Sequence, residues 1–315
     1  MASKILIVDP LTLIGRELAR CIENTPDLAF EIDYRHTAAD DEQQITELGA
    51  EPALVPPLTD PDDTGGASII VVTSEAETDR TGVLEDLMIR HPEVTVIDVS
   101  RLPRLMDLTA PAIGISALTA ERNHLRVAHP ALAATAAVLG ALGPLDPVRG
   151  CVAAVDPVSV FGREAIEVLV HQAGRRMQGG VPEHDIDGHT LAFNQVAVDS
   201  DALTEEAAEL FRQFPLAVTR TLAGNFHGHL AHLAIELAEP VDDPDLRDAF
   251  ESAPSVVLGE TPISLDLVPD RDHVLLTQPQ ISPDRRMVAM TAMVDGLRIG
   301  GALTAVDILR SMTVH

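Results

Sequence analysis

KILIVD, residues 4–9, is a short apolar run without the polar alternation of a strand that faces water. Runs of this kind are typical of parallel strands that are covered on both faces. The next segment, LIGRELARCIE (13–23), places its apolar residues at helical spacing. A strand followed at once by a helix predicts a right-handed β–α–β unit and therefore a parallel sheet.

The same alternation continues along the first part of the chain. ASIIVVTS (67–74) and VTVIDVS (94–100) are further buried-type strands, and DRTGVLEDLMIRH (79–91) between them has helical spacing. ALVPPLTDPDDTGGA (53–67) is rich in Pro, Asp and Gly, which predicts a loop. These elements predict an α/β, Rossmann-type doubly wound domain.

The second part of the chain predicts a different architecture. RGCVAAVDPVSV (149–160) has the composition of a strand, and two helices are expected, over 163–180 with a stop at Gly179 and Gly180, and over 204–214 with Thr204 as N-cap. Extended segments are expected at LAVTRTL (216–222), HLAHLAIELA (229–238), ISLDLVP (263–269), HVLLTQPQI (273–281) and RMVAMTAMV (286–294). We therefore expect an α+β domain with an antiparallel sheet over 129–299, and assign residues 1–128 and 300–315, which contain a closing helix over 300–312, to the first domain.

Composition excludes several classes of function. The formal net charge is −27, and a field of that sign repels phosphate backbones and anionic lipid. The only lysine is Lys4, which argues against Schiff-base and P-loop chemistry. Two distant cysteines, Cys21 and Cys151, exclude a disulfide framework or a cysteine zinc site, and we expect both to be buried free thiols. Without a membrane-length apolar run or a secretion signal, a cytoplasmic location is expected.

Six short segments then follow one another in a telling order: VIDVSRLPR (96–104), HPALAATAAVLGALGPL (129–145), VSVFGREAIEVL (158–169), LAFNQVA (191–197), GHLAHLAIEL (228–237) and VDGLRIGGALTAV (294–306). Their order resembles the aspartate-semialdehyde dehydrogenase family and, more distantly, N-acetyl-γ-glutamyl-phosphate reductase. The family counterparts include V-I-D-x-S-x-x-F-R and N-P-G-C-Y-A-T-A. The resemblance covers nearly the whole chain and implies an NADP-binding Rossmann domain followed by a dimerisation domain.

The position that the family gives to its nucleophilic cysteine is Leu132 in this sequence. A thiolate there, at a helix N-terminus, attacks the substrate and forms a thioester. Shifting the alignment by one residue gives Ala131 or Ala133, and Cys151 lies 19 residues further along. The resemblance therefore implies that thioester chemistry is lost.

Most of the family's substrate-orienting groups are also replaced. Asp156 stands at the position of a glutamine, Leu222 at that of an arginine with Arg220 two residues away, and Ala208 at that of a lysine. The family's base position retains His229, and its phosphate-binding position retains Arg104. Without a nucleophile, the resemblance implies no catalytic residues.

The expected cofactor turn, DPLTLIG (9–15), departs from the family's G-A-T-G-x-V-G in the same way. Only Gly15 remains, and Asp9 adds a negative charge beside the pyrophosphate position. The segment TSEAETD (73–79) lacks the family's second glycine as well. The binding site is degenerate, and no cofactor is expected where the family uses NADP.

FHGHLAH (226–232) raises the question of a metal site. On a strand, His227 and His229 share a face, whereas His232 points the other way. Retention of His229 from the family and exposure of the other two explain the pattern without an ion, so no metal is expected.

We predict a catalytically inactive relative of aspartate-semialdehyde dehydrogenase, retained as a dimeric scaffold or regulatory protein. Its sheet, over about residues 217–295, is expected to form a homodimer, because the resemblance implies that this sheet makes the two-fold interface. An active paralogue is an alternative partner. Two other functions stay open: an active NADP-dependent semialdehyde dehydrogenase of amino-acid biosynthesis with a non-standard site, and a module that binds a small molecule in the vacated cleft.

Overall fold

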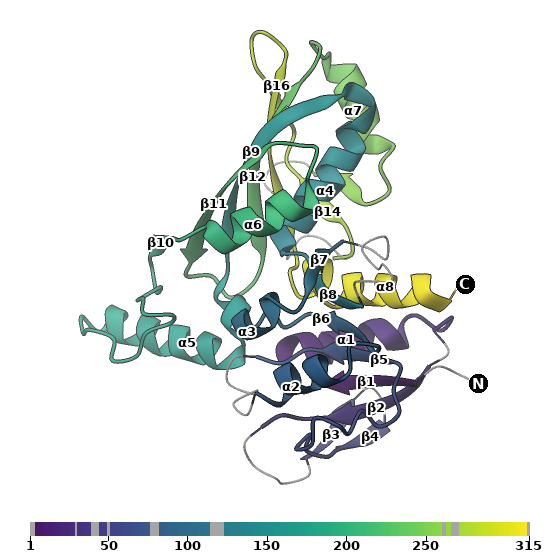
Figure 1. Cartoon of the computed structure of the whole chain (residues 1–315). Helices are drawn as coiled ribbons and strands as arrows, with labels where there is room; N and C mark the ends of the chain where they lie inside the picture. The colour runs from purple at the N-terminus through teal and green to yellow at the C-terminus, as the bar shows by residue number, and fades with distance from the viewer. Residues whose placement is uncertain are drawn as a thin grey trace. The chain divides into compact units, whose positions relative to one another are not determined.

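The computed structural model describes residues 4–28, 30–38, 44–48, 51–75, 82–113, 123–259, 263–265 and 271–313. The chain divides into two compact units, one formed by residues 1–128 with 301–315 and the other by residues 129–300 (Figure 1). Each unit is described by itself below.

The first unit is built on a six-stranded sheet in the order β2-β1-β5-β6-β8-β7, and every neighbouring pair is parallel. This confirms the predicted α/β doubly wound fold. Its strands are β1 (Lys4–Val8), β2 (Glu31–Arg35), β5 (Ile69–Val72), β6 (Thr95–Asp98), β7 (Ala110–Ala112) and β8 (His124–Val127).

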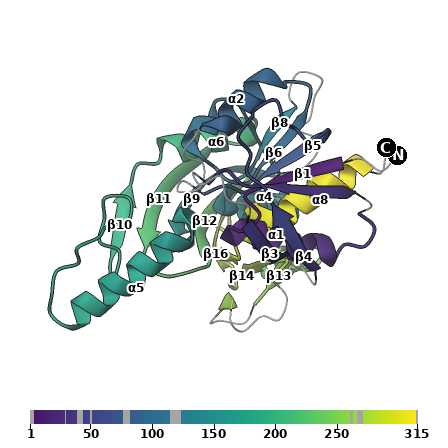
Figure 2. The ribbon, with the colours of Figure 1, turned by 90° about the horizontal axis from the view of Figure 1, so that it is seen from below.

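Helices cover both faces of this sheet. Ile5 and Ile7 of β1 pack in one cluster with α1 (Leu13–Glu23) and α8 (Leu303–Thr313). Leu6 and Val8 point to the other face, towards α2 (Val83–Arg90) and α3 (Pro103–Met106). Figure 2 shows α2 on one side of β1, β5 and β6, and α1 and α8 on the other. Burial on both faces is the physical reason that KILIVD contains no polar residue between Lys4 and Asp9.

A separate two-stranded hairpin is formed by β3 (Gln44–Leu48) and β4 (Glu51–Val55). Residues 53–55, which the composition assigned to a loop, therefore lie in a strand, and the prediction was wrong at that end. Pro52 hides the strand in the sequence pattern, because Pro argues against a strand except at an edge, and β4 pairs only with the short strand β3 in this hairpin.

The second unit is built on an eight-stranded sheet in the order β10-β11-β9-β12-β16-β14-β13, with β15 also paired to β16. The antiparallel sheet that the sequence predicted is in fact mixed, because β9 pairs with β11, and β13 with β14, in parallel. The connection from β9 to β11 contains two helices and β10, which is long enough for a parallel crossover. The strands are β9 (Pro147–Asp156), β10 (Gln195–Val198), β11 (Leu216–Ala223), β12 (His229–Leu237), β13 (Val256–Leu258), β14 (Val274–Leu276), β15 (Gln280–Ile281) and β16 (Met287–Val294).

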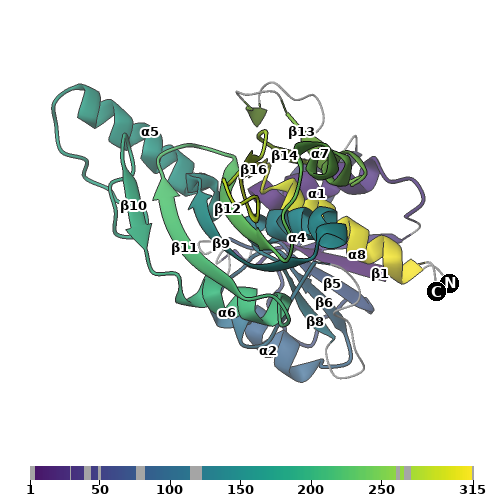
Figure 3. The ribbon, with the colours of Figure 1, turned by 90° about the horizontal axis from the view of Figure 1, so that it is seen from above.

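One face of this sheet, called the inner face here, carries the core of the second unit. α4 (Pro130–Leu142) packs on β9, β12 and β16, α6 (Asp201–Leu210) on β11, and α7 (Asp243–Glu251) on β13. Figure 3 shows α4 and α6 beside these strands. α4 is apolar almost all round, as expected of a helix in a core. α5 (Arg163–Met177) packs instead with Leu222 at the end of β11.

Three smaller expectations also needed revision. α6 begins at Asp201 with Ser200 as N-cap, so Thr204 lies inside the helix. Residues 263–265 of ISLDLVP are not in a strand, and residues 266–269 lie outside the described residues. α8 starts at Leu303, after a π-helical turn over 298–302. Within the described residues, no helix is both long and apolar enough to span a membrane.

Candidate functional site

The second unit buries a charged cluster at the end of its central strand. Asp156, the last residue of β9, is completely buried on the inner face. Arg220 of β11 donates a hydrogen bond from Nε to Asp156 Oδ2 at 2.7 Å, and His129 Nε2 lies 3.2 Å from the same oxygen. The other oxygen, Oδ1, is 4.0 Å from His229 Nε2. Sheet pairing explains the cluster, because Asp156 lies opposite Leu222 in β11 and one step beyond the pairing of Val155 with Leu230 in β12.

The environment of Asp156 favours its charged form. Burial on its own raises the pKa of this carboxyl. Interaction with His129, and then with His229 and Arg220, acts in the opposite direction and is larger, so the pKa lies well below its usual range. A carboxylate is thus retained where the family resemblance places a neutral glutamine.

His129 occupies the N-cap of α4. Its Nδ1 accepts a hydrogen bond from the backbone N–H of Ala131 at 3.2 Å, which satisfies one free donor of the first turn. The lone pair on Nδ1 assigns the proton to Nε2, which then donates to Asp156. Glu206 of α6, also buried, accepts a hydrogen bond at 2.6 Å from the backbone N–H of His129. The sequence analysis singled out neither residue; the His-Pro step before an apolar helix was the available signal.

His229 begins β12 and is buried on the inner face. Its ring meets that of His129 edge to face, with centroids 5.6 Å apart. Gly296 lies against the ring, and a Cβ at that position would overlap His229. His227 lies in the turn before the strand and is exposed, so the expected pairing of His227 and His229 on one strand face was wrong. His232 is exposed on the opposite face, as predicted.

The replaced family positions lie in very different surroundings. Leu132 is completely buried in the first turn of α4 and belongs to the main core of the second unit. Leu222 is buried beside α5, whereas Ala208 is exposed on α6. The site therefore gathers His229, Asp156 and Arg220 from the sequence analysis, adds His129 and Glu206, and leaves Ala208 at the surface.

Neither thiol lies in the cluster. Cys21 is buried in the core of the first unit, on α1. Cys151 is exposed on the face of β9 that points away from Asp156, which corrects the expectation that both thiols are buried. Alternation along the strand explains the difference, because residues an odd number apart point to opposite faces.

In the first unit, the turn after β1 is held by its own side chains. Asp9 is buried with a left-handed backbone (φ 59°), and its carboxylate accepts hydrogen bonds from the backbone N–H and the hydroxyl of Thr37, at 2.7 and 2.6 Å. The hydroxyl of Ser74 donates a further bond to Asp9 Oδ2. These bonds fix the negative charge of Asp9 at the turn where the family resemblance places a dinucleotide phosphate.

Side chains of this protein also accept hydrogen bonds from the backbone N–H groups at the N-terminus of α1. Thr12 caps the helix by accepting from the backbone N–H of Gly15 at 3.1 Å, and Glu75 Oε1 accepts from the backbone N–H of Leu13 at 3.0 Å. The carboxylate of Glu75 therefore interacts with the helix end that would otherwise attract a phosphate. A Cβ on Gly15 would come within 2.6 Å of the carbonyl carbon of Pro10, which explains why this glycine alone remains.

Arg104 lies on the four-residue helix α3, after the turn in which Asp98 accepts from the backbone N–H of Ser100 at 2.9 Å. Arg101 of this turn has a left-handed backbone (φ 56°). Arg104 belongs to the first unit, and its phosphate-binding role stays a prediction.

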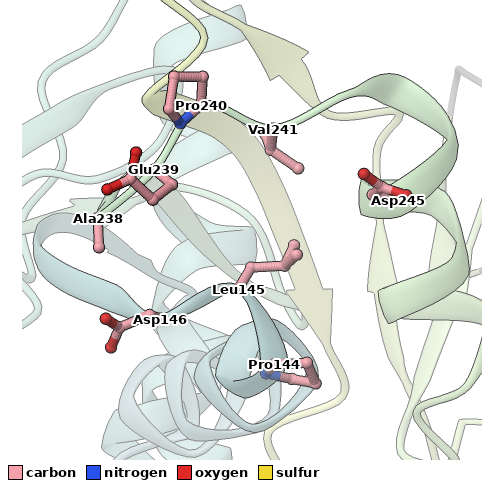
Figure 4. A pocket seen from close by; sticks show the side chains of 8 residues that line it. All are labelled: Pro144, Leu145, Asp146, Ala238, Glu239, Pro240, Val241 and Asp245. Carbon is pink, nitrogen blue, oxygen red and sulfur yellow. The ribbon is translucent and has the colours of Figure 1, made fainter.

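The second unit also has a hollow of about 230 Å³ away from the cluster, next to η2 (Gly143–Leu145) and the start of α7 (Figure 4). Figure 4 shows aliphatic side chains together with three carboxylates, those of Asp146, Glu239 and Asp245. The lining contains no histidine, cysteine or basic residue, so the carboxylates are its only ionisable groups.

Sequence comparison with curated proteins supports the resemblance over part of the chain. No protein-family model matches the chain. A USG-1 protein homolog of Azotobacter vinelandii is 30% identical over 152 residues, which cover 43% of this chain and 45% of that protein. The aspartate-semialdehyde dehydrogenase of Shewanella violacea is 26% identical over 225 residues, or 64% of this chain and 66% of that enzyme. The matches thus span about half to two thirds of the length of these relatives.

Similarity to solved structures extends over the whole chain. The aspartate-semialdehyde dehydrogenase II of Vibrio cholerae, solved as a complex with ASA, superposes with a TM-score of 0.85 at 16% identity, covering 100% of this chain and 99% of that one. A probable aspartate-semialdehyde dehydrogenase from Pseudomonas aeruginosa gives 0.83 at 19% identity with the same coverage. The resemblance found in the sequence is therefore confirmed: the chain has the two-domain fold of the aspartate-semialdehyde dehydrogenases along its whole length.

Proposed function

We propose that this chain does not carry out the thioester reaction of aspartate-semialdehyde dehydrogenase and acts instead as a dimeric scaffold or regulatory relative. The observation that carries the proposal is Leu132. Its side chain is completely buried in the main core of the second unit, so hydrocarbon fills the position from which a thiolate would attack.

The polar groups of the site agree with this proposal. Asp156 is a buried carboxylate, and it repels an acidic substrate where the family's glutamine would hydrogen-bond it. His129 and Arg220 already engage this carboxylate. His229 keeps the base position but has no thiol to deprotonate in the described part of the unit, since Cys151 is on the other face of β9.

The nucleotide turn supports the same proposal. Asp9 and Glu75 present carboxylates at the end of β1 and at the N-terminus of α1. NADP binding in the family's pose would bring its phosphates against these charges. At about 4 Å, two like charges repel by roughly 1 kcal/mol even in bulk water and by more near protein.

The surface proposed for dimerisation is the outer face of the second sheet, opposite α4. Its central strands expose or half-bury mainly small and apolar side chains, with His232 on β12 and the Arg149–Glu236 ion pair at the other end of β12, although the chain as a whole carries a net charge of −27. A continuous face of this kind is typical of an interface between copies. It comprises Cys151, Ala153 and Val155 of β9, Ala217, Thr219 and Thr221 of β11, Leu230, His232 and Ala234 of β12, and Met287, Ala289, Thr291 and Met293 of β16.

An activity assay tests the catalytic part of the proposal. Purified protein is expected to give no turnover with NADP, aspartate semialdehyde and phosphate, and none in the reverse direction. Turnover above the rate without enzyme, which persists after substitution of both Cys21 and Cys151, would refute it. Loss of the turnover on these substitutions would instead identify an unrecognised thiol nucleophile and refute it as well.

Analytical ultracentrifugation tests the dimer at low micromolar concentration in low and high salt. Both salt conditions are needed because the negative charge opposes association when it is unscreened. We expect a dimer that buries on the order of 2,000 Å². Ala153→Arg, in the centre of the outer face, should give monomers, and Ala208→Arg, the same change on the exposed surface of α6, should not. A wild-type monomer in both salts would contradict the dimer.

A further inference from the structure

We propose that His129, Asp156 and His229 bind one divalent transition-metal ion of the zinc class. This inference does not rest on the proposed loss of thioester chemistry, nor on the dimer. It starts from a juxtaposition that no spacing along the chain reveals: the three side chains come from the cap of α4, the end of β9 and the start of β12.

The separations of the donor atoms suit a single ion. One ligand atom from each of the three residues lies within 4.8 Å of the other two. His129 Nε2 and Asp156 Oδ2 are 3.2 Å apart, and His229 Nε2 and Asp156 Oδ1 are 4.0 Å apart. With metal–ligand bonds of about 2.0–2.2 Å, tetrahedral geometry separates two ligand atoms by roughly 3.3 Å. Side-chain shifts below about 1.5 Å would therefore bring all three ligand atoms to the separations that a tetrahedral ion requires.

The surroundings favour a cation at this point. Oδ1 of Asp156 is buried and accepts no hydrogen bond from the described residues, which is costly for a carboxylate oxygen unless a further partner is present. Arg220 holds the second oxygen at 2.7 Å and so orients the carboxylate, as outer-shell groups do around ligating carboxylates. Two imidazoles and one carboxylate favour Zn²⁺ or Co²⁺ over Mg²⁺ or Ca²⁺.

Binding has to change the tautomer of His129. In the metal-free geometry His129 Nε2 donates to Asp156, and Nδ1 caps α4. An ion at Nε2 takes the place of that proton and moves the imidazole proton to Nδ1, at the expense of the 3.2 Å cap bond from Ala131. Zinc and cobalt bind imidazole strongly enough to suit this exchange, and three protein ligands leave a fourth position for water or a small ligand.

The experiment uses the full chain, free of any histidine tag and treated with a chelator, and titrates it with Zn²⁺ by calorimetry and with Co²⁺ by visible absorption. We expect one ion per chain, with a dissociation constant of about 1 µM or below, and the visible bands of tetrahedral Co²⁺. His229→Gln and Asp156→Asn should abolish the site, and Arg220→Gln should weaken it by roughly 10–100-fold. His232→Gln, the same change on the outer face of the same strand, should leave it intact.

Anomalous scattering from zinc-soaked crystals of the wild-type protein locates the ion without any variant, which covers the case in which a substituted chain does not fold. A peak among the three side chains supports the inference. Less than about 0.1 equivalent of bound ion, a peak elsewhere, or loss of binding in His232→Gln but not in His229→Gln would each overturn it.

Discussion

Leu132→Cys restores the residue type that the family resemblance places at the nucleophile position, and we expect it to destabilise the protein without creating a nucleophile. Leu132 is completely buried in the core of the second unit. The change keeps Cβ, replaces Cγ by sulfur and removes two methyl groups, which costs about 1.6 kcal/mol in transfer free energy. With the cavity that remains, the expected total is about 2–3 kcal/mol. For a unit of this size that corresponds to a fall in Tm of roughly 4–12 °C.

Thiol labelling measures whether the introduced sulfur is reactive. In a Cys151→Ser background the exposed native thiol is absent and Cys21 is buried. We expect no fast reaction with a disulfide reagent in the native protein and reaction of two thiols after unfolding in guanidinium, because burial in apolar surroundings disfavours the thiolate. Calorimetry supplies the Tm, and the dehydrogenase assay should still give no turnover. A fast-reacting thiol in the native state, or measurable turnover, would refute the reasoning that position 132 is buried and inaccessible to reagent and substrate.

Three further outcomes are expected. Asp156→Asn should lower the free energy of unfolding at pH 7 by about 1–3 kcal/mol, because it removes the charge that the half-buried Arg220 and the buried His129 engage. Because the pKa of Asp156 is lowered in the folded state, this stabilisation is complete above the unfolded-state pKa of about 3.9 and declines as the pH falls below it. Urea unfolding should therefore show a smaller difference in stability between wild type and variant at pH 3 than at pH 7. An equal difference at the two pH values would contradict the assignment. Gly296→Ala should destabilise by about 1–3 kcal/mol by pushing the His229 ring, whereas the control Gly174→Ala on α5, whose added Cβ meets nothing within 4 Å, should not. Calorimetry should detect no binding of NADP or NAD at sub-millimolar concentration, and a dissociation constant near 10 µM would mean that the turn from Asp9 to Gly15 accepts the pyrophosphate.

The first domain was the more predictable one. Its three predicted strands, β1, β5 and β6, lie in the middle of a parallel sheet, and burial on both faces leaves a continuous apolar run that is visible without any partner strand. The other three strands, β2, β7 and β8, were not predicted. The first helix was predicted with the observed bounds, Leu13–Glu23. The edge hairpin of β3 and β4 was missed, because edge strands have little burial to impose a pattern.

The second domain was predicted in its long strands but not in its connections, and β10, α7 and β13 were missed. Alternation along β12 and β16 is clear in the sequence, since one face is buried and the other is not. The direction in which β9 and β11 pair is not encoded in either strand, and it follows from the long crossover between them. The exposure of Cys151 depended on which residues of β9 face α4, and the expected burial of thiols could not decide that.

The sequence by itself placed Leu132, Asp9 and His229 in the family pattern, and so predicted a lost nucleophile, a charge at the expected cofactor turn and a retained base position, because these are statements about residue types at positions in a pattern. Only the tertiary structure decided that Asp156, His129, His229 and Arg220 meet in one buried cluster. Residues 129, 156, 220 and 229 are brought together by sheet register and by the docking of α4 on the inner face. A buried carboxylate acquires its chemistry from such non-local neighbours, and their identity cannot be derived from local propensity or spacing.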